Sequence, residues 1–278
     1  MIEPGRTEFD PPATAGGALP SGLVSVVVPA YNEKDNIAPL LEAIDGALAG
    51  KVPYEIVVVD DGSHDGTREE LLTQKRGRPH LRVVGLDRNH GQTAAFGAGI
   101  TAAHGDVIVT MDADLQNDPQ DVLALLERLE GADAVVGYRT VRRDSWLRRL
   151  SSRLANRIRN KLTNESIRDV GCSLKVFRAA PLRSIPLFEG LHRFFPTLLK
   201  MRGYRVVEVP VGHHPRRHGQ SKYGVRNRLL RSLLDCLAVR WMQWRLLRYK
   251  ASELGEPSSP QARADGNRVA LGEERQHR

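Results

Sequence analysis

The chain has 278 residues, with 41 lysines and arginines against 33 aspartates and glutamates, and a formal net charge of +8 at pH 7. This length can bury a sizeable core as one large domain or two small ones. The basic balance indicates an anionic partner, either nucleic acid, a phosphorylated ligand or an acidic membrane surface. The two cysteines, Cys172 and Cys236, lack metal-type spacing and favour a reducing compartment. We expect neither a signal peptide nor a membrane-spanning helix, because the apolar runs are too short.

Short apolar runs rich in β-branched residues alternate with helical patterns along most of the chain. Strands are predicted at residues 24–28, 55–59, 81–86, 107–111 and 134–138, and helices at 36–49, 67–75, 92–104 and 121–129. This alternation predicts a doubly wound, mostly parallel α/β sheet within one domain, residues 22–224. The polar ends, 1–21 and 251–278, are predicted to be disordered tails. The sequence contains no GxGxxG or Walker A loop, so neither a dinucleotide fold nor a P-loop NTPase is supported.

Polar residues follow each of the first two predicted strands. Pro29 is expected to end the first strand. Capping of the next helices can account for several neighbours, namely Asn32, Asp35, Asn36, Asp65 and Thr67. Capping does not explain the doubled acid Asp60-Asp61 at the end of the second strand. A carboxylate there can accept hydrogen bonds from a nucleobase N–H or a ribose hydroxyl.

Two further carboxylates come directly after the apolar run 107–110. Asp112 and Asp114 are two residues apart, so in an extended chain they leave on the same side, about 6.6 Å apart. At the carboxyl end of a parallel strand, that side opens onto the crevice where α/β folds bind ligands. Two anionic oxygens there suit Mg²⁺ or Mn²⁺, with coordination positions left for substrate phosphates. The alternative for this motif by itself is a solvated turn.

The second half of the chain carries donors suited to phosphates. Arg139 directly follows the strand predicted at 134–138, beside the predicted metal site, and a basic amphipathic helix is predicted from Trp146. Asp169 is either a turn residue or an acid near the sugar. A glycine-flanked loop after a strand beginning at Val207 supplies further donors: Arg216, Arg217, Ser221 and Lys222.

Residues 225–250 predict a final amphipathic helix. Its apolar stripe is Leu230, Leu233, Leu234, Leu237, Trp241 and Trp244, with arginines beside it. Tryptophan with arginine favours a membrane interface. Packing on the domain, or in a dimer, is the alternative, and the sequence leaves both open.

Four motifs give the chain a family resemblance. The segments "VVVPAYNE", "EIVVVDDGSHDGT", "NHGQTAAFGAGI" and "GDVIVTMDADLQNDP" stand in the order and spacing of glycosyltransferase family 2. The chain resembles most its dolichol-phosphate mannose synthase and polyprenyl-phosphate glycosyltransferase branch, over roughly residues 23–225. That resemblance implies the GT-A fold, which binds nucleotide-diphosphosugars.

The resemblance also implies roles for individual residues. The nucleotide-sugar would be held by Pro29, Tyr31, Glu33, Asp60, Asp61 and Asp112. The metal would be held by Asp112, Asp114 and Gln116. A segment of the form "HxPRxxGxSKYG" accompanies lipid-phosphate binding in this branch, which implies that role for Arg216, Arg217, Ser221 and Lys222. The catalytic residues implied are Asp114, Arg139, Arg217 and Lys222.

The function predicted is inverting, metal-dependent transfer of mannose or another hexose from a nucleotide-diphosphosugar to a polyprenyl phosphate, dolichyl or undecaprenyl. The donor would be GDP-mannose or a UDP-sugar, and the metal Mg²⁺ or Mn²⁺. The protein would work at the cytoplasmic face of an anionic membrane, as a peripheral protein. A polysaccharide or protein acceptor is the alternative, although Leu237 replaces the glutamine of the Gln-x-x-Arg-Trp motif of processive synthases. Nucleic acid is not expected as a partner, because acidic strand ends would repel its phosphates.

Overall fold

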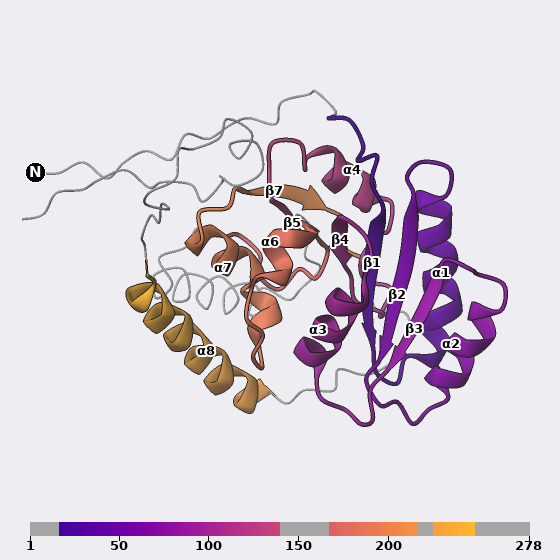
Figure 1. Ribbon diagram of the computed structural model, residues 1–278. Helices are drawn as coiled ribbons and strands as arrows, with labels where there is room; N and C mark the ends of the chain where they lie inside the picture. The colour runs from indigo at the N-terminus through magenta and orange to yellow at the C-terminus, as the bar shows by residue number, and fades with distance from the viewer. Residues whose placement is uncertain (1–16, 140–166, 216–224, 248–278) are drawn as a thin grey trace, which may run out of the picture.

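The computed structural model describes residues 17–139, 167–215 and 225–247, which form a twisted sheet with helices on both faces (Figure 1). The strands are β1 Val24–Ala30, β2 Tyr54–Asp60, β3 Leu81–Gly85, β4 Val107–Thr110, β5 Ala134–Arg139, β6 Lys175–Arg178 and β7 Val206–Val211. The helices are α1 Lys34–Leu48, α2 Thr67–Lys75, α3 Gln92–Ala102, α4 Asp121–Glu127, α6 Ala179–Arg183, α7 Phe195–Met201 and α8 Val225–Arg245, with a 3-10 helix η1 at Leu191–Arg193.

The seven strands lie in the order β3-β2-β1-β4-β6-β5-β7. The pairs β1–β2, β1–β4, β2–β3 and β5–β7 are parallel, and β6 is antiparallel to both β4 and β5. The predicted mostly parallel α/β sheet is therefore confirmed. Since β1, β2, β4 and β5 run in the same direction, their carboxyl ends face the same edge of the sheet, where the predicted acidic residues lie.

Two apolar layers enclose the sheet. The first joins the sheet to α1, α2 and α4, and the second joins it to α3, α6, α7 and α8. Helix α8 contributes Cys236 and Val239 to the second layer, with exposed fractions of 6% and 0%. Both cysteines are buried as free thiols. Among the described residues, no helix combines the length and hydrophobicity that crossing a membrane requires.

Strand β1 continues through Pro29, which we expected to end it, and Pro29 lies in register with Val59 of β2. The backbone directions explain why a proline is tolerated there. The carbonyl of Ala30 accepts a hydrogen bond from Asp61 N on the β2 side, so the backbone groups of Pro29 face the β4 side. Strand β4 has already ended at Thr110, so the missing N–H of Pro29 costs no ladder hydrogen bond.

The predicted tails fall mostly outside the described residues, and their boundaries stay a prediction. Residues 17–22 are described, and Leu19 packs against the first core layer. The basic helix predicted from Trp146 also lies outside the described residues.

Candidate active site

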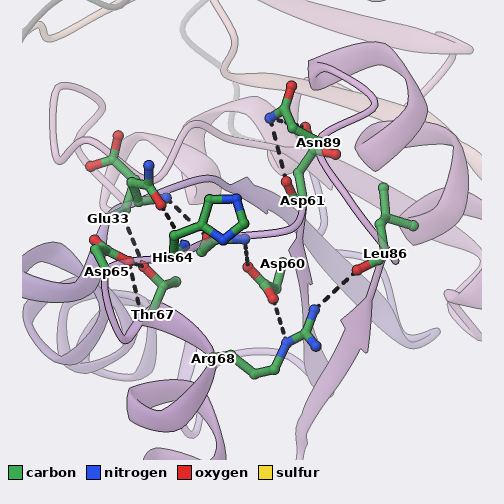
Figure 2. A network of polar contacts seen from close by, with 11 residues as sticks. Glu33, Asp60, Asp61, His64, Asp65, Thr67, Arg68, Leu86 and Asn89 are labelled. Atoms are coloured by element: carbon green, nitrogen blue, oxygen red, sulfur yellow. Dashed lines mark hydrogen bonds and ion pairs between the residues drawn. The ribbon is translucent and has the colours of Figure 1, made fainter.

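The turn after β1 is tied to the loop after β2, as Figure 2 shows. Asn32, with a positive φ of 52°, accepts a hydrogen bond from His64 N at 2.8 Å, and its own N–H donates to Ser63 Oγ at 2.9 Å. Glu33 N donates to Thr67 Oγ1 at 2.9 Å. Asn32 was a candidate cap, but it links two loops instead. The residue at the N-cap position of α1 is Glu33.

Tyr31 and Glu33, both predicted to bind the nucleotide, are partly exposed on this turn. The Glu33 carboxylate also accepts a hydrogen bond from Asn36 Nδ2 at 2.6 Å, in the first turn of α1. Hydrogen bonds therefore join the loops after β1 and β2 into one rigid unit at the sheet edge, here called the braced loops.

Asp60 lies at the base of this unit and is 0% exposed. Ser63 N donates to Asp60 Oδ1 at 3.0 Å, and Arg68 Nε donates to Asp60 Oδ2 at 2.7 Å. Arg68 also donates through Nη2 to Leu86 O at 3.0 Å, so its guanidinium joins the ends of β2 and β3 (Figure 2). Arg68 was not predicted as a site residue, because it stands eight positions after Asp60 on a different element, the helix α2.

Asp61, which is 3% exposed, organises the loop that leads into α3. Its Oδ1 accepts from His90 N at 2.7 Å, and its Oδ2 accepts from Gly91 N at 2.9 Å and Asn89 Nδ2 at 3.0 Å. The next residue, Gln92, begins α3 and donates through Nε2 to Asp112 Oδ1 at 2.7 Å. Asp61 therefore positions the segment that contacts Asp112.

The turn at Gly62 requires glycine. Its φ is +69°, and a Cβ there would lie 2.4 Å from the backbone carbonyl carbon of Arg88. A side chain would force the β2 and β3 loops apart.

Asp112 and Asp114 follow β4, as predicted. Burial and then the negative charge of Asp114 raise the pKa of Asp112 from 3.8 to about 6. Asp114 is 6% exposed, and its Oδ1 accepts from Gln116 N at 3.2 Å. Asp114 is buried and Asp112 is partly buried. Two like charges removed from water in this way do not fit a solvated turn, because they are costly unless a cation compensates them. The donor set therefore fits a hard divalent cation.

Gln116, the third predicted ligand, holds the segment that follows β7. Its backbone carbonyl accepts from His214 N at 2.9 Å, and its Nε2 donates to His214 O at 3.4 Å. Among the described residues, no group of three or more His, Cys, Asp or Glu could enclose a metal. A cation at Asp112 and Asp114 would therefore take further ligands from substrate oxygens or water.

Arg139, at the end of β5, is fixed by Asp169. Its Nε donates to Asp169 Oδ2 at 2.6 Å and its Nη2 to Asp169 Oδ1 at 2.9 Å, a bidentate pair. Beside this pair lies Lys175, which is 4% exposed. Burial lowers the pKa of Lys175, and the charges of Cys172, Asp112 and Asp169 oppose that change. Nothing in the sequence pattern alone assigned a role to Lys175.

The structure thus brings together the predicted residues of β1, β2, β4 and β5 at one edge of the sheet. The predicted acceptor loop lies outside the described residues: Arg216, Arg217, Ser221 and Lys222. The described part of that segment reaches the aspartate loop through the His214–Gln116 hydrogen bond.

Comparisons with known proteins agree with this arrangement. The family model described as "Glycosyl transferase family 2" matches residues 25–185. A dodecaprenyl-phosphate galacturonate synthase of Rhizobium johnstonii is 40% identical over 260 residues, which are 90% of this chain and 72% of that protein. An undecaprenyl-phosphate 4-deoxy-4-formamido-L-arabinose transferase of Edwardsiella ictaluri is 41% identical over 224 residues, 78% of this chain and 68% of that protein.

Two solved structures share the fold. Glucosyl-3-phosphoglycerate synthase from Mycobacterium tuberculosis, in complex with Mn²⁺ and uridine-diphosphate-glucose, has a TM-score of 0.60 at 22% identity, covering 79% of each chain. A mannosyltransferase from Pyrobaculum calidifontis, in complex with GDP-Man and Mn²⁺, has a TM-score of 0.56 at 20% identity, covering 85% of this chain and 78% of that one. The resemblance drawn from the four motifs is confirmed: the chain belongs to glycosyl transferase family 2 and is a glycosyltransferase with a GT-A fold.

Proposed function

We propose that this enzyme moves a sugar from a nucleotide-diphosphosugar to a polyprenyl phosphate, with inversion at the anomeric carbon and with Mg²⁺ or Mn²⁺. The relatives named for dodecaprenyl and undecaprenyl phosphate support this acceptor, since their similarity extends over 90% and 78% of the chain. The observation that carries the proposal is the aspartate pair after β4, the partly buried Asp112 and the buried Asp114, at the same sheet edge as Asp60 and Arg139.

The nucleoside would bind over the braced loops after β1 and β2. Tyr31 offers a partly exposed aromatic ring there, beside Pro29 and Glu33. Asp60 and Asp61 are buried and accept hydrogen bonds from protein donors. They therefore fix the loops that line this site and also give it negative charge. GDP-mannose and UDP-sugars are both compatible with these residue types.

Asp112 and Asp114, with Gln116, would hold the metal. When bound, the metal would neutralise charge on the leaving diphosphate. Gln92 holds Asp112 on one side, and the backbone N–H of Gln116 fixes Asp114. These contacts keep both carboxylates in place before substrate arrives, which reduces the reorganisation that catalysis would require.

The acceptor phosphate would bind between Arg139 and the loop after β7. Arg139 lies in register with Val211, the last residue of β7, so the two strands end side by side. The His214–Gln116 hydrogen bond then directs the chain toward the aspartates. Arg216, Arg217, Ser221 and Lys222 follow directly and would supply the phosphate donors. An acceptor phosphate is already ionised near neutral pH, so positioning and charge matter more than a strong base.

The test of this function is an acceptor comparison at fixed metal and donor. Purified protein with Mn²⁺ would be given GDP-mannose or UDP-sugars and either a short polyprenyl phosphate or the matching polyprenol. We expect a lipid-phosphate-linked sugar from the phosphate and no product from the alcohol. Equal transfer to the alcohol, or transfer to an oligosaccharide or protein only, would favour the other acceptor class.

Replacing Asp114 by Asn removes one charged metal ligand while keeping the side-chain shape. We expect transfer to fall at least about a hundredfold at saturating Mn²⁺, because charge on the leaving diphosphate is no longer compensated. Asp106→Asn, which removes an exposed carboxylate just before β4 at the opposite end from the site, is the control and should keep near-normal activity. Wild-type rates for Asp114→Asn, or for the native enzyme in excess chelator, would contradict the metal assignment.

Replacing Asp60 by Ala leaves Ser63 N and Arg68 without their acceptor. Nucleoside diphosphate should bind more weakly by roughly 1–3 kcal/mol, and the free energy of unfolding should fall by a similar amount. Calorimetry and urea unfolding measure the two effects, with exposed Asp35→Ala as the control. A loss of stability with unchanged nucleotide affinity would show that Asp60 only stabilises the loops and does not contribute to nucleotide binding.

Helix α8 supports attachment to an anionic membrane. The side chains of Leu234, Leu237, Trp241 and Trp244 are 48–72% exposed and fall on one stripe, opposite the buried Val239. Arg240 and Arg245 flank that stripe, and Arg240 lies 5.2 Å from the ring centroid of Trp244. Exposed tryptophan between arginines suits the boundary of an anionic lipid surface. We therefore infer a peripheral position, at the cytoplasmic face.

Alanine at both Trp241 and Trp244 should weaken binding to anionic liposomes about tenfold or more, because each ring loses burial at the lipid boundary. High salt should release the native protein, since arginine attraction is screened. Leu72→Ala, which removes an exposed leucine on α2, is the control for flotation assays. Unchanged binding of the double variant, or a native dimer that ignores liposomes, would show that the stripe serves protein packing.

A further inference from the structure

Lys175 is a buried lysine to which the proposed mechanism above assigns no role. It begins β6 and is 4% exposed, although lysine is rarely buried this deeply unless it is paired. The next residues, Val176 and Phe177, belong to opposite core layers. Alternation along the strand therefore puts Lys175 on the Phe177 side, the side that α3 covers.

The sheet register locates Lys175 between two functional strand ends. It lies opposite Thr110 of β4 and Val136 of β5. Strand β4 runs on directly to Asp112, and β5 ends at Arg139. Lys175 is thus positioned beneath the edge where the predicted metal ligands and the predicted phosphate-binding arginine meet.

Hydrogen bonds fix the segment before Lys175 against the aspartate loop. Asn117 Nδ2 donates to Ser173 Oγ at 2.7 Å. Thr110 Oγ1 donates to Ser173 O at 2.7 Å. The backbone that carries Lys175 is therefore held to both β4 and the loop that follows it.

Lys175 lies near more carboxylates than other basic side chains. Arg139 is engaged by Asp169 in the bidentate pair. The charge of Lys175 acts on Asp112 and on Asp169, and Asp114 adds a further negative charge beside Asp112. A buried ammonium in this position acts through a low-dielectric interior, where fixed charges have long reach.

We propose that Lys175 is an electrostatic positioning residue, whose fixed positive charge favours the phosphate groups of the substrates at the cost of weaker metal binding. The proposal rests on the proposed function. A cation beneath the site attracts the donor diphosphate and the acceptor phosphate, and it repels a divalent metal. Its removal should therefore shift the two affinities in opposite directions, which a loss of packing would not do.

The test replaces Lys175 by Met, which has similar length and no charge. Binding of GDP and UDP would be measured by calorimetry at saturating Mn²⁺, and binding of Mn²⁺ alone by electron paramagnetic resonance. We expect the nucleotide affinity to fall about tenfold and the Mn²⁺ affinity to rise severalfold. Lys51→Met removes an exposed lysine and should change neither affinity. Lys175→Arg keeps the charge and should restore nucleotide binding.

Unchanged affinities in Lys175→Met would overturn the proposal. A fall in both affinities together with a lower unfolding midpoint would do the same, since it would show that Lys175 only supports packing. If the Met variant does not fold, Lys175→Gln carries the same test with a neutral polar side chain. Both binding measurements omit the acceptor, so they remain decisive for Lys175 even if polyprenyl phosphate is the wrong acceptor.

Discussion

Burial of carboxylates at the ends of parallel strands is the constraint on which this site depends. Asp60, Asp61 and Asp114 are each at most 6% exposed, and a buried charge is costly without partners. The chain meets that cost with donors drawn from other segments. Ser63 and Arg68 donate hydrogen bonds to Asp60, and the loop before α3 donates hydrogen bonds to Asp61. Loops far apart in sequence are thereby locked into one frame before any substrate binds.

The same constraint explains why the frame extends from the nucleoside side to the phosphate side. Asp61 orders the loop that starts α3, and Gln92 at its first position contacts Asp112. On the other side of β4, Ser173 O accepts a hydrogen bond from Thr110 Oγ1, and Lys175 of the antiparallel strand β6 lies in register with Thr110. A change at the β2 end can therefore reach the aspartates through a short series of contacts. Rigid support of this kind suits a reaction that depends on positioning and charge.

Much of this architecture was predictable from local patterns. The strands from β1 to β5 are apolar and β-branched, and their polar ends mark the sheet edge. Strand β6 was not predictable, because its four residues have only Val176 and Phe177 between two charged residues. Arg68 and Lys175 act through contacts that exist only after the sheet assembles. In sequence, Arg68 is only a basic residue a few positions after an acidic strand end, and Lys175 is only a basic residue between apolar ones, patterns that surface residues also give.

Helix α8 shows a different limit of sequence patterns. Apolar residues occur on two sides of it, so periodicity alone could not say which side packs on the domain. The structure buries Cys236 and Val239 and exposes Trp241 and Trp244. Cys236 and Val239 pack into the second core layer, and that packing decides which face of α8 is buried. The face of α8 that carries Trp241 and Trp244 is therefore available to a partner, which we propose to be the membrane surface.

Crystals grown with Mn²⁺ and a nucleoside diphosphate would test the central claim most directly, through anomalous diffraction at the manganese edge. The account predicts one manganese peak at about 2.2 Å from carboxylate oxygens of Asp112 or Asp114, with diphosphate oxygens completing its ligands and the base beside Tyr31. Manganese bound away from both aspartates, or a nucleotide bound away from the braced loops of β1 and β2, would contradict it.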